Sequence, residues 1–476
     1  MAPDHGTAGQ RARVLALSTI AFTLLFAVWL MLGMLSIKIK PELGLTDGQL
    51  YNLTIAAILS GSLLRFNFGI WADRYGGRRV MTALLLFTII PTLLVSQVTT
   101  YAQLLVCALL YGVAGNSFTV GIAWNAAWFP RDRQGTALGV FGAGNVGASV
   151  TKLIGPLLIA AMPATGFFDG LIPGGWRFIP VMYAGLLALM AAAVWFLTPS
   201  PDRMPARGRA FSELVAPMKH AKVWEFSLQY AVVFGAYVAL SGVLPQFYYA
   251  NYGANLAASL GLNEKLVAEF DTIKGLKGDT YTAYMAANPA VKADLDYLTK
   301  WIGILAAICY IFPASLLRPV GGWLSDKYGA RGVMAAVFWG MIASGVALAF
   351  PLGLGVWSFT IFLFVLGVGM GIGKASVYKM IPDHFPREVG SVGGLVGALG
   401  AIGGVLLPLA WGVIPGSTFA ALLALTVISA GWFVLSHLRF RAANPEAIMP
   451  GSERGDALAG AVAVPAGSQS EQVGVR

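Results

Sequence analysis

The sequence predicts an all-α membrane protein with twelve transmembrane helices in two pseudo-symmetric six-helix bundles. Three observations support this fold class. Of the 476 residues, 57% are hydrophobic and only 11% are charged, whereas about a quarter of the residues in soluble domains carry a charge. Apolar runs of about twenty residues, the length that crosses the hydrocarbon core of a bilayer, recur along the chain. Two short motifs of the first half also return in the second half.

Twelve apolar segments are expected to cross the membrane. They comprise residues 14–39, 50–71, 80–99, 102–128, 135–162, 178–198, 223–249, 301–324, 333–352, 356–381, 389–413 and 416–437. The basic residues behind the net charge of +10 lie in short loops on one side of these segments, which we call the basic face, and not in a patch that would indicate nucleic acid. The positive-inside rule places the basic face and both termini in the cytoplasm, as a multi-pass protein of the cell inner membrane.

The segments between the spans define the domain organisation. The expected order is a cytoplasmic N-terminus at 1–13, a six-helix bundle at 14–198, a cytoplasmic linker at 199–222, a second bundle at 223–437 with an insert at 251–300, and a cytoplasmic tail at 438–476. The insert is polar and charge-balanced, and it is expected to form a small cap on the outer face with short helices at 263–273 and 289–297. The composition of the tail predicts disorder.

One motif occurs twice, at an interval of 253 residues. Ser62-Leu-Leu-Arg65 precedes Asp73-Arg-Tyr-Gly-Gly-Arg78, and Ser315-Leu-Leu-Arg318 precedes Asp326-Lys-Tyr-Gly-Ala-Arg331. Since a helix rises 1.5 Å per residue, each arginine is expected about 12 Å deeper in the membrane than its aspartate, near the midplane. A second repeated pair, Phe129-Pro-Arg-Asp132 and Phe385-Pro-Arg-Glu388, supports two bundles related by a near-twofold axis along the membrane normal.

Arg65 and Arg318 are the strongest candidates for a binding site. A charge at this depth is costly, and no acidic residue lies at a comparable depth in any expected span to pair with it. Snorkelling to the membrane surface would have to cover about 12 Å, which is a long reach for a side chain. A guanidinium presents planar, forked donors that match planar oxyanions. The two arginines are therefore predicted to hold one anion between the bundles, and a cationic substrate is excluded.

Three further residues are expected to contact the substrate. Asn145 lies in the glycine-rich segment 139–148, where close helix packing explains the glycines but not a buried amide. Tyr230 and Phe234 lie one turn apart, so they share a face of the seventh span, and aromatic packing is the alternative role for this pair. These residues favour a small anion.

The two repeated turns are expected to have a conformational role rather than a contact with substrate. Acidic and basic residues at a helix end can pair across helices as the two bundles rock, and so form a gate on the cytoplasmic side. The gating residues are Asp73, Arg74, Arg78, Asp326, Lys327 and Arg331.

Three lysines, Lys152, Lys374 and Lys379, lie within or near the ends of expected spans. A desolvated lysine beside arginines can exchange a proton as an anion arrives, which makes these residues candidates for proton coupling. For Lys379, which lies near the cytoplasmic end, snorkelling is an equally good explanation. The two cysteines, Cys107 and Cys309, fall inside expected spans, so no disulfide is predicted.

Several of these motifs resemble known signatures. Gly69-x-x-x-Asp73-Arg-x-Gly76-x-Arg78-Arg79 resembles the signature of the major facilitator superfamily. Gly142-Ala-Gly144-Asn145-Val-Gly147 and the glycine run at 393–404 resemble the paired signatures of the nitrate/nitrite porter (NarK-type) family. This resemblance, which spans all twelve helices, implies alternating access and nitrate or nitrite as substrate. It also implies that Arg65 and Arg318 clamp the substrate, with Tyr230, Phe234 and Asn145 beside it.

The resemblance also bears on energy coupling. The segment Gly373-Lys-Ala-Ser-Val-Tyr-Lys379, together with Lys152, is similar to the nitrate/proton symporter branch of that family. The sequence therefore predicts a transporter, not an enzyme, which takes up nitrate with protons, needs no cofactor or metal and works as a monomer in the bilayer. The alternatives are nitrate/nitrite antiport, transport of organic phosphates, and an anion sensor or channel on the same fold.

Overall fold

The computed structural model describes residues 6–443, except for 33–34, 36–38, 40–41, 148, 150–153, 156–157, 159–161, 164–165, 169–171, 277, 351–352 and 414–417. Within these residues the regular structure is helical, apart from one isolated antiparallel bridge between Phe167 and Ile172. Ten helices of the described part are long and apolar enough to cross a membrane. The predicted all-α membrane fold is confirmed.

The first bundle follows the expected order of spans. Its elements are α1 (Ala8–Trp29), α3 (Asp47–Leu63), α4 (Arg65–Tyr75), α5 (Gly77–Val95), α6 (Tyr101–Gly112), η1 (Val113–Asn116), α7 (Ser117–Trp128), α8 (Arg131–Gly142), η2 (Ala143–Val146), η3 (Gly175–Arg177) and α10 (Phe178–Leu197). The fifth expected span, 135–162, continues from α8 and η2 into a stretch that falls largely outside the described residues.

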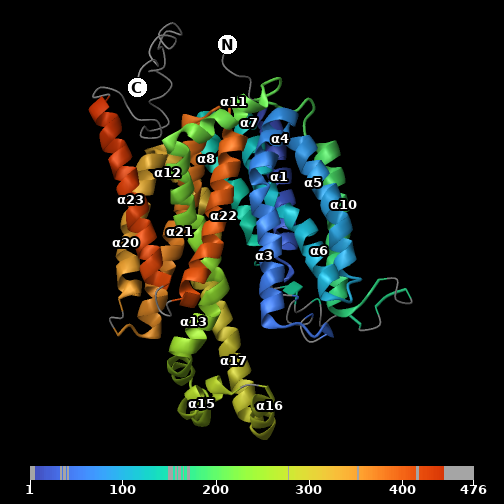
Figure 1. Cartoon of the computed structure of the whole chain (residues 1–476), viewed down its shortest axis with the longest axis vertical. Coiled ribbons are helices and arrows are strands. Elements are labelled where there is room, and N and C mark those ends of the chain that lie inside the picture. Colours follow the sequence, from blue (N-terminus) through green and yellow to red (C-terminus); the bar gives the residue numbers. More distant parts are fainter. Residues whose placement is uncertain are drawn as a thin grey trace.

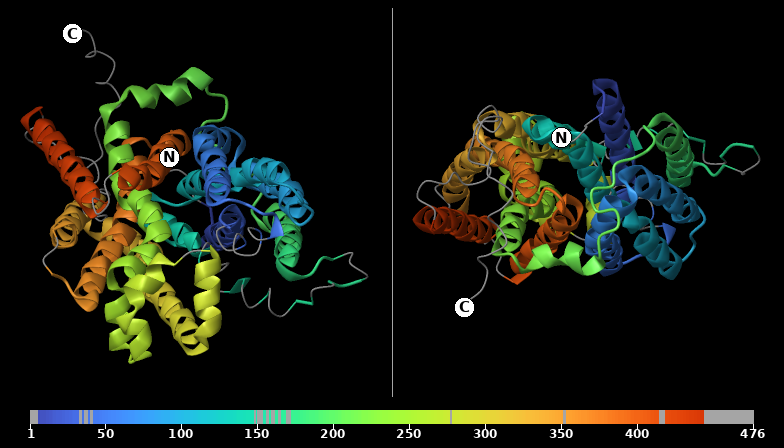
Figure 2. Two further views of the ribbon diagram at one scale, coloured as in Figure 1. Left: turned by 60° about the horizontal axis from the view of Figure 1, so that its bottom comes forward. Right: turned by 90° about the horizontal axis from the view of Figure 1, so that it is seen from above.

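The second bundle repeats this pattern. Its elements are α12 (Ala221–Tyr230), η5 (Ala231–Gly235), α13 (Ala236–Ser259), α17 (Pro289–Ala306), η6 (Ala307–Ile311), α18 (Phe312–Leu316), α19 (Arg318–Tyr328), α20 (Ala330–Ala349), α21 (Val356–His384), α22 (Val389–Val413) and α23 (Thr418–Ala443). The two bundles stand side by side (Figures 1 and 2), and the linker carries α11 (Phe211–Val215) and η4 (Ala216–Lys219) across them.

The insert differs from the expected small cap. Helix α13 continues ten residues past the expected end of its span at 249, and α17 begins at Pro289, twelve residues before the expected start at 301. The predicted helix at 289–297 is therefore the first part of α17, and the predicted helix at 263–273 is divided between α14 (Glu264–Ala268) and α15 (Phe270–Gly275). With α16 (Gly278–Ala287), these helices form a tip on two continuous helices at the end opposite to α11 (Figure 1).

Both chain ends are more helical than expected. Helix α1 begins at Ala8, inside the expected N-terminal segment 1–13, because Thr7 and Gln10 form a capping box at its start. Helix α23 continues to Ala443, six residues into the expected tail. The rest of the predicted disordered tail lies outside the described residues.

The repeated motif produces the same backbone in both bundles. Leu64 separates α3 from α4, and Leu317 separates α18 from α19, so each buried arginine is the first residue after a break in its span. At the other end of each motif the chain turns at a glycine with positive φ, 90° at Gly76 and 83° at Gly329. Glycine is required there because other residues adopt this conformation only at a cost. The repeat therefore fixes the depth of each arginine and the sharp turn after it.

Candidate anion-binding site

The two repeated arginines are both buried and both reach the opposite bundle. Arg65 is 0% exposed; its Nε donates to the carbonyl of Gly61 at 2.9 Å, and Nη1 donates to the carbonyl of Gly397 at 3.0 Å. Arg318 is 2% exposed, and its Nη1 donates to the carbonyl of Gly142 at 3.1 Å. Each arginine thus contacts a glycine carbonyl across the interface between the bundles.

Two aromatic rings bring the arginines into one site. The guanidinium carbon of Arg65 lies 5.9 Å from the ring centroid of Phe118 and 5.6 Å from that of Phe234. The corresponding distances from Arg318 are 5.3 and 5.9 Å. Because each ring lies against both cations, the two guanidinium groups belong to a single cluster at the centre of the molecule. Trp29 adds a third face, 5.4 Å from Arg65.

The arginines keep unused hydrogen-bond donors. Nη2 of Arg65 and Nε of Arg318 are buried and have no hydrogen-bond partner among the described residues. Neither arginine forms an ion pair with any carboxylate in that part of the chain. A buried donor left unsatisfied costs about 1–3 kcal/mol, and more when it is charged. An anion between the two guanidinium groups would supply both the acceptors and the missing charge.

Tyr230 and Asn145, which were expected to contact the substrate, both lie against Arg318. Nη2 of Arg318 donates to the Tyr230 hydroxyl at 3.2 Å. With its amide turned so that the oxygen faces the guanidinium, Asn145 accepts from Nη1 and Nη2 at 3.3 and 3.2 Å. Asn145 belongs to η2, the 3-10 segment that follows α8. Phe234 stacks on Tyr230 with a centroid distance of 4.9 Å, so the aromatic packing weighed as an alternative is present too.

The three lysines do not form one group. Lys374 is 1% exposed; its Nζ donates to the carbonyl of Ala314 at 3.0 Å and lies 3.1 Å from the ring centroid of Tyr237 and 5.8 Å from that of Phe234. Lys374 therefore borders the arginine site. Lys379 lies instead in a polar network at the basic face, and Lys152 is outside the described residues.

Phe118, Trp29 and Tyr378 of the cluster were not predicted from the sequence. Phe118 is an apolar residue in an apolar span and gives no signal of its own. Tyr378 packs edge-to-face on Phe118 and Tyr230, with centroid distances of 5.0 and 4.8 Å, and its hydroxyl donates to the carbonyl of Gly393. Its position between Lys374 and Lys379 in the same motif was the available signal.

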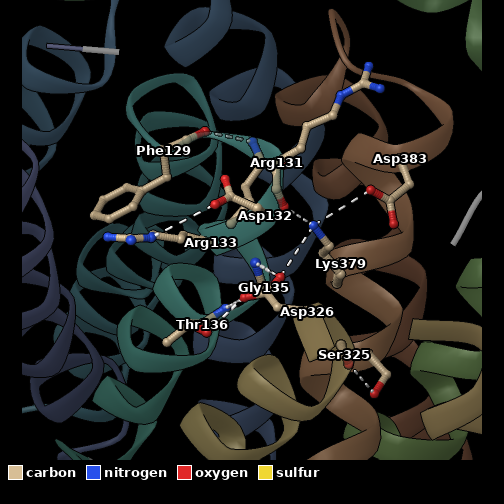
Figure 3. A network of polar contacts seen from close by, with 12 residues as sticks. Phe129, Arg131, Asp132, Arg133, Gly135, Thr136, Ser325, Asp326, Lys379 and Asp383 are labelled. Carbon is tan, nitrogen blue, oxygen red and sulfur yellow. Dashed lines mark hydrogen bonds and ion pairs between the residues drawn. The ribbon is translucent and has the colours of Figure 1, made fainter. Parts of the chain in front are cut away.

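At the basic face the two bundles meet in two seams, each centred on a repeated aspartate. Asp73 of α4 accepts from the backbone N–H groups of Gly390 and Ser391 at the start of α22, at 2.9 and 3.3 Å. Asp326 of α19 accepts from the N–H groups of Gly135 and Thr136 in α8, at 2.9 and 2.6 Å (Figure 3). Both seams are closed in this structure.

The other four expected gating residues have contacts within their own bundle or with the linker. Arg78 binds linker residue Asp202 through its backbone N–H, and Arg331 lies 3.9 Å from the carboxylate of Glu225. Arg74 and Lys327 lie over aromatic rings of their own helices, Tyr75 for the first, Trp323 and Tyr328 for the second. Among the described contacts of the six residues, only those of the two aspartates join the bundles.

Comparison with known proteins identifies the family. The profile of the Major Facilitator Superfamily matches residues 17–264 and 278–468. The chain belongs to this superfamily. A solved structure of the superfamily, the transporter FucP in the outward conformation, superimposes with a TM-score of 0.60 at 17% identity and covers 88% of this chain and 98% of its own. The expectation of a membrane transporter rather than an enzyme is confirmed.

Curated members of this superfamily resemble the chain over nearly its whole length. The probable nitrate/nitrite antiporter NarK1 of Thermus thermophilus is 49% identical, covering 90% of this chain and 92% of its own. The probable nitrate/nitrite transporter NarK2 of Mycobacterium tuberculosis (strain H37Rv) is 31% identical, covering 85% and 89%. The nitrite extrusion protein of Bacillus subtilis is 26% identical, covering 83% and 85%.

Proposed function

We propose that this major facilitator takes up nitrate, with nitrite as a second substrate, across the inner membrane by alternating access. The observation that carries the proposal is the pair of buried arginines with unused donors and no carboxylate partner among the described residues. The names of the curated relatives, which refer to nitrate or nitrite, support the choice of anion. The basic face would be cytoplasmic, with both termini on that side.

The dimensions of the cluster favour a small planar monoanion over an organic phosphate. Phe118 and Phe234 lie within 6 Å of both guanidinium groups, so aromatic faces occupy much of the space around the charges. Such faces suit the flat surface of nitrate, while the forked N–H groups suit its three oxygens. A phosphate ester would bring a second charge and a bulky group into this apolar lining.

Transport would require the two seams at the basic face to open. The seams are held by hydrogen bonds from backbone N–H groups to Asp73 and Asp326, which can form and break without a change of secondary structure. An anion that binds the unused donors of Arg65 and Arg318 would attract both guanidinium groups, which also donate to glycine carbonyls of the opposite bundle. Occupation of the site would thereby alter the balance between the closed and open seams.

For coupling, we propose proton symport with Lys374 as the proton-exchanging group. Lys374 is buried beside the arginine site, where an ammonium gains little from solvent and is repelled by the guanidinium charge of Arg318. Proteoliposomes with an empty lumen test this directly. Nitrate uptake driven by an imposed pH gradient supports symport, and replacing Lys374 with methionine should remove the pH dependence, whereas Lys219→Met, at an exposed linker position, should not.

Antiport is the second candidate, because the relative with 49% identity is named as a probable nitrate/nitrite antiporter. In the same proteoliposomes, nitrate uptake that requires nitrite inside and ignores the pH gradient would establish exchange and exclude symport. The arginine site could serve symport or antiport. The outcome of the coupling experiments therefore does not affect the proposal for the binding site.

A further inference from the structure

Two side chains of the second bundle form hydrogen bonds with a single turn of α8. Asp326 accepts from the N–H groups of Gly135 and Thr136 and, at 2.7 Å, from the Thr136 hydroxyl. Lys379 of α21 donates to the carbonyl of Arg131 (Figure 3). Arg131 lies four residues before Gly135, the spacing of one helical hydrogen bond. The Asp326 carboxylate therefore accepts from the N–H groups of this turn, and the Lys379 ammonium donates to its carbonyl.

Lys379 is also the cation of a buried ion cluster. Its Nζ lies 3.3 Å from Asp326 and 3.7 Å from Asp383, and its side chain is 8% exposed. One ammonium thus joins three helices, α8 through Arg131, α19 through Asp326 and its own α21. Breaking a buried ion pair is costly because it leaves an uncompensated charge. Separation of the bundles at this seam would leave two neighbouring carboxylates with less compensation.

The other seam lacks this cation. Asp73 accepts two N–H groups at the start of α22, but no lysine or arginine forms an ion pair with it among the described residues. In the repeated Phe-Pro-Arg motif next to Lys379, Phe129 corresponds to Phe385 at an interval of 256 residues, so the position equivalent to Lys379 is Ala123, an apolar residue. The nearest charged contact at that seam joins Arg209 of the linker to Glu388, at 2.5 Å. Both seams therefore contain an aspartate of the repeated motif, but among the described residues only the seam at Asp326 has a lysine paired with that aspartate.

We propose that Lys379 is a positioning residue that holds the seam between α8 and α19 closed, and that it is neither a substrate ligand nor a proton carrier. The proposal rests on the alternating-access function above, since a contact that holds the seam closed matters only if the bundles separate during transport. Removal of the ammonium should shift the protein toward the state that is open at the basic face.

Spin-label distances test this without transport. Labels at Arg133, whose side chain is 73% exposed, and at Tyr328, also exposed, report on the width of the seam once the two free cysteines have been replaced. In nitrate-free nanodiscs, Lys379→Met should raise the ratio of long to short distances roughly tenfold. Lys379→Arg should restore most of the short distance. The control, Lys219→Met, removes an exposed lysine of the linker and should match the unsubstituted protein.

An unchanged distance distribution in folded Lys379→Met, or an equal shift in Lys219→Met, would overturn the proposal. If Lys379→Met is not recovered from the membrane, Lys379→Gln, which is one atom shorter but keeps a polar N–H donor without the charge, serves the same test. The outcome is separable from the proposed substrate. A shift in distances without nitrate uptake would support the role of Lys379 and contradict nitrate as the substrate. Nitrate uptake with unshifted distances would contradict the role of Lys379 alone.

Discussion

Arg318 donates to the hydroxyl of Tyr230 at 3.2 Å from one nitrogen while its neighbouring nitrogen donates to Gly142 of the other bundle at 3.1 Å. Arg65 makes the equivalent contact in the opposite sense, to Gly397. Each guanidinium group therefore joins the bundles through Nη1 and keeps another N–H without a hydrogen-bond partner among the described residues, Nη2 in Arg65 and Nε in Arg318. If an anion binds as proposed, it would bind the same two guanidinium groups that join the bundles, so binding could act directly on the interface.

Replacing either arginine with lysine should weaken nitrate binding by roughly ten- to hundredfold, because hydrogen bonds to charged groups contribute about 1.5–3 kcal/mol. Lysine keeps the charge but loses the planar fork and cannot reach two acceptors in one plane. Binding to Arg65→Lys and Arg318→Lys in detergent would be measured by calorimetry. Arg79→Lys, at an exposed position on the basic face, is the control. Normal affinity in both single variants would exclude the clamp.

Asn145 separates the effect of charge from that of a hydrogen bond. Asn145→Ala removes one acceptor from Arg318 and should lower nitrate affinity by about tenfold. Asn145→Asp keeps an acceptor but places a carboxylate against the guanidinium, so it should pair with Arg318 and abolish binding altogether. The order of the two variants in a nitrate titration checks this. An aspartate variant that binds better than the alanine variant would contradict an anion site here.

The sequence predicted the elements that repeat. The arginines, the aspartates and the glycine turns occur in both halves, and duplication distinguishes such residues from chance. Periodicity also located the spans, because a membrane imposes their length and composition. The insert was predicted less well, since α13 and α17 continue beyond the expected spans and nothing in an apolar pattern marks where such helices end.

Features that depend on contacts between the two bundles were harder to predict from the sequence. Phe118 lies between the two arginines only because α7 packs against both bundles, and an aromatic residue in an apolar span carries no signal of this. Lys379 was grouped with Lys374 by its position in one motif, yet the two lie five residues apart on α21 and reach different partners. The backbone carbonyls to which Lys374 and Lys379 donate lie 60 and 248 residues away along the chain.

Asp202 of the linker is predicted to be important for stability. Its carboxylate accepts from the indole N–H groups of Trp124 and Trp128, both at 3.0 Å, and from the backbone N–H groups of Arg78 and Arg203, both at 2.8 Å. Asp202→Ala would leave four donors without this acceptor and should lower the free energy of unfolding by about 3 kcal/mol. The apparent melting temperature in detergent measures the loss.

Two comparisons make that measurement specific. Asp202→Asn keeps one carbonyl acceptor and should fall between alanine and the unsubstituted protein. Glu213→Ala, at a linker residue whose side chain is 54% exposed, should leave the melting temperature nearly unchanged. Equal losses in Asp202→Ala and Glu213→Ala would show that the linker, and not this carboxylate, determines the effect.

A carboxylate on the face opposite to the basic face should make stability depend on pH. Burial alone would raise the pKa of Glu42, but hydrogen bonds from Trp176 and Arg177 and the charge of Arg177 outweigh it and lower that pKa. Because the folded-state pKa lies below the unfolded value, the contribution of Glu42 to the free energy of unfolding is present at neutral pH. It is lost as the pH falls through the folded-state pKa. The effect should be small, because the side chain is 43% exposed and solvent screens it. Glu42→Gln should therefore melt slightly below the unsubstituted protein at pH 7, and the two melting temperatures should converge in acid. A constant difference across that range would rule out Glu42 as the titrating group.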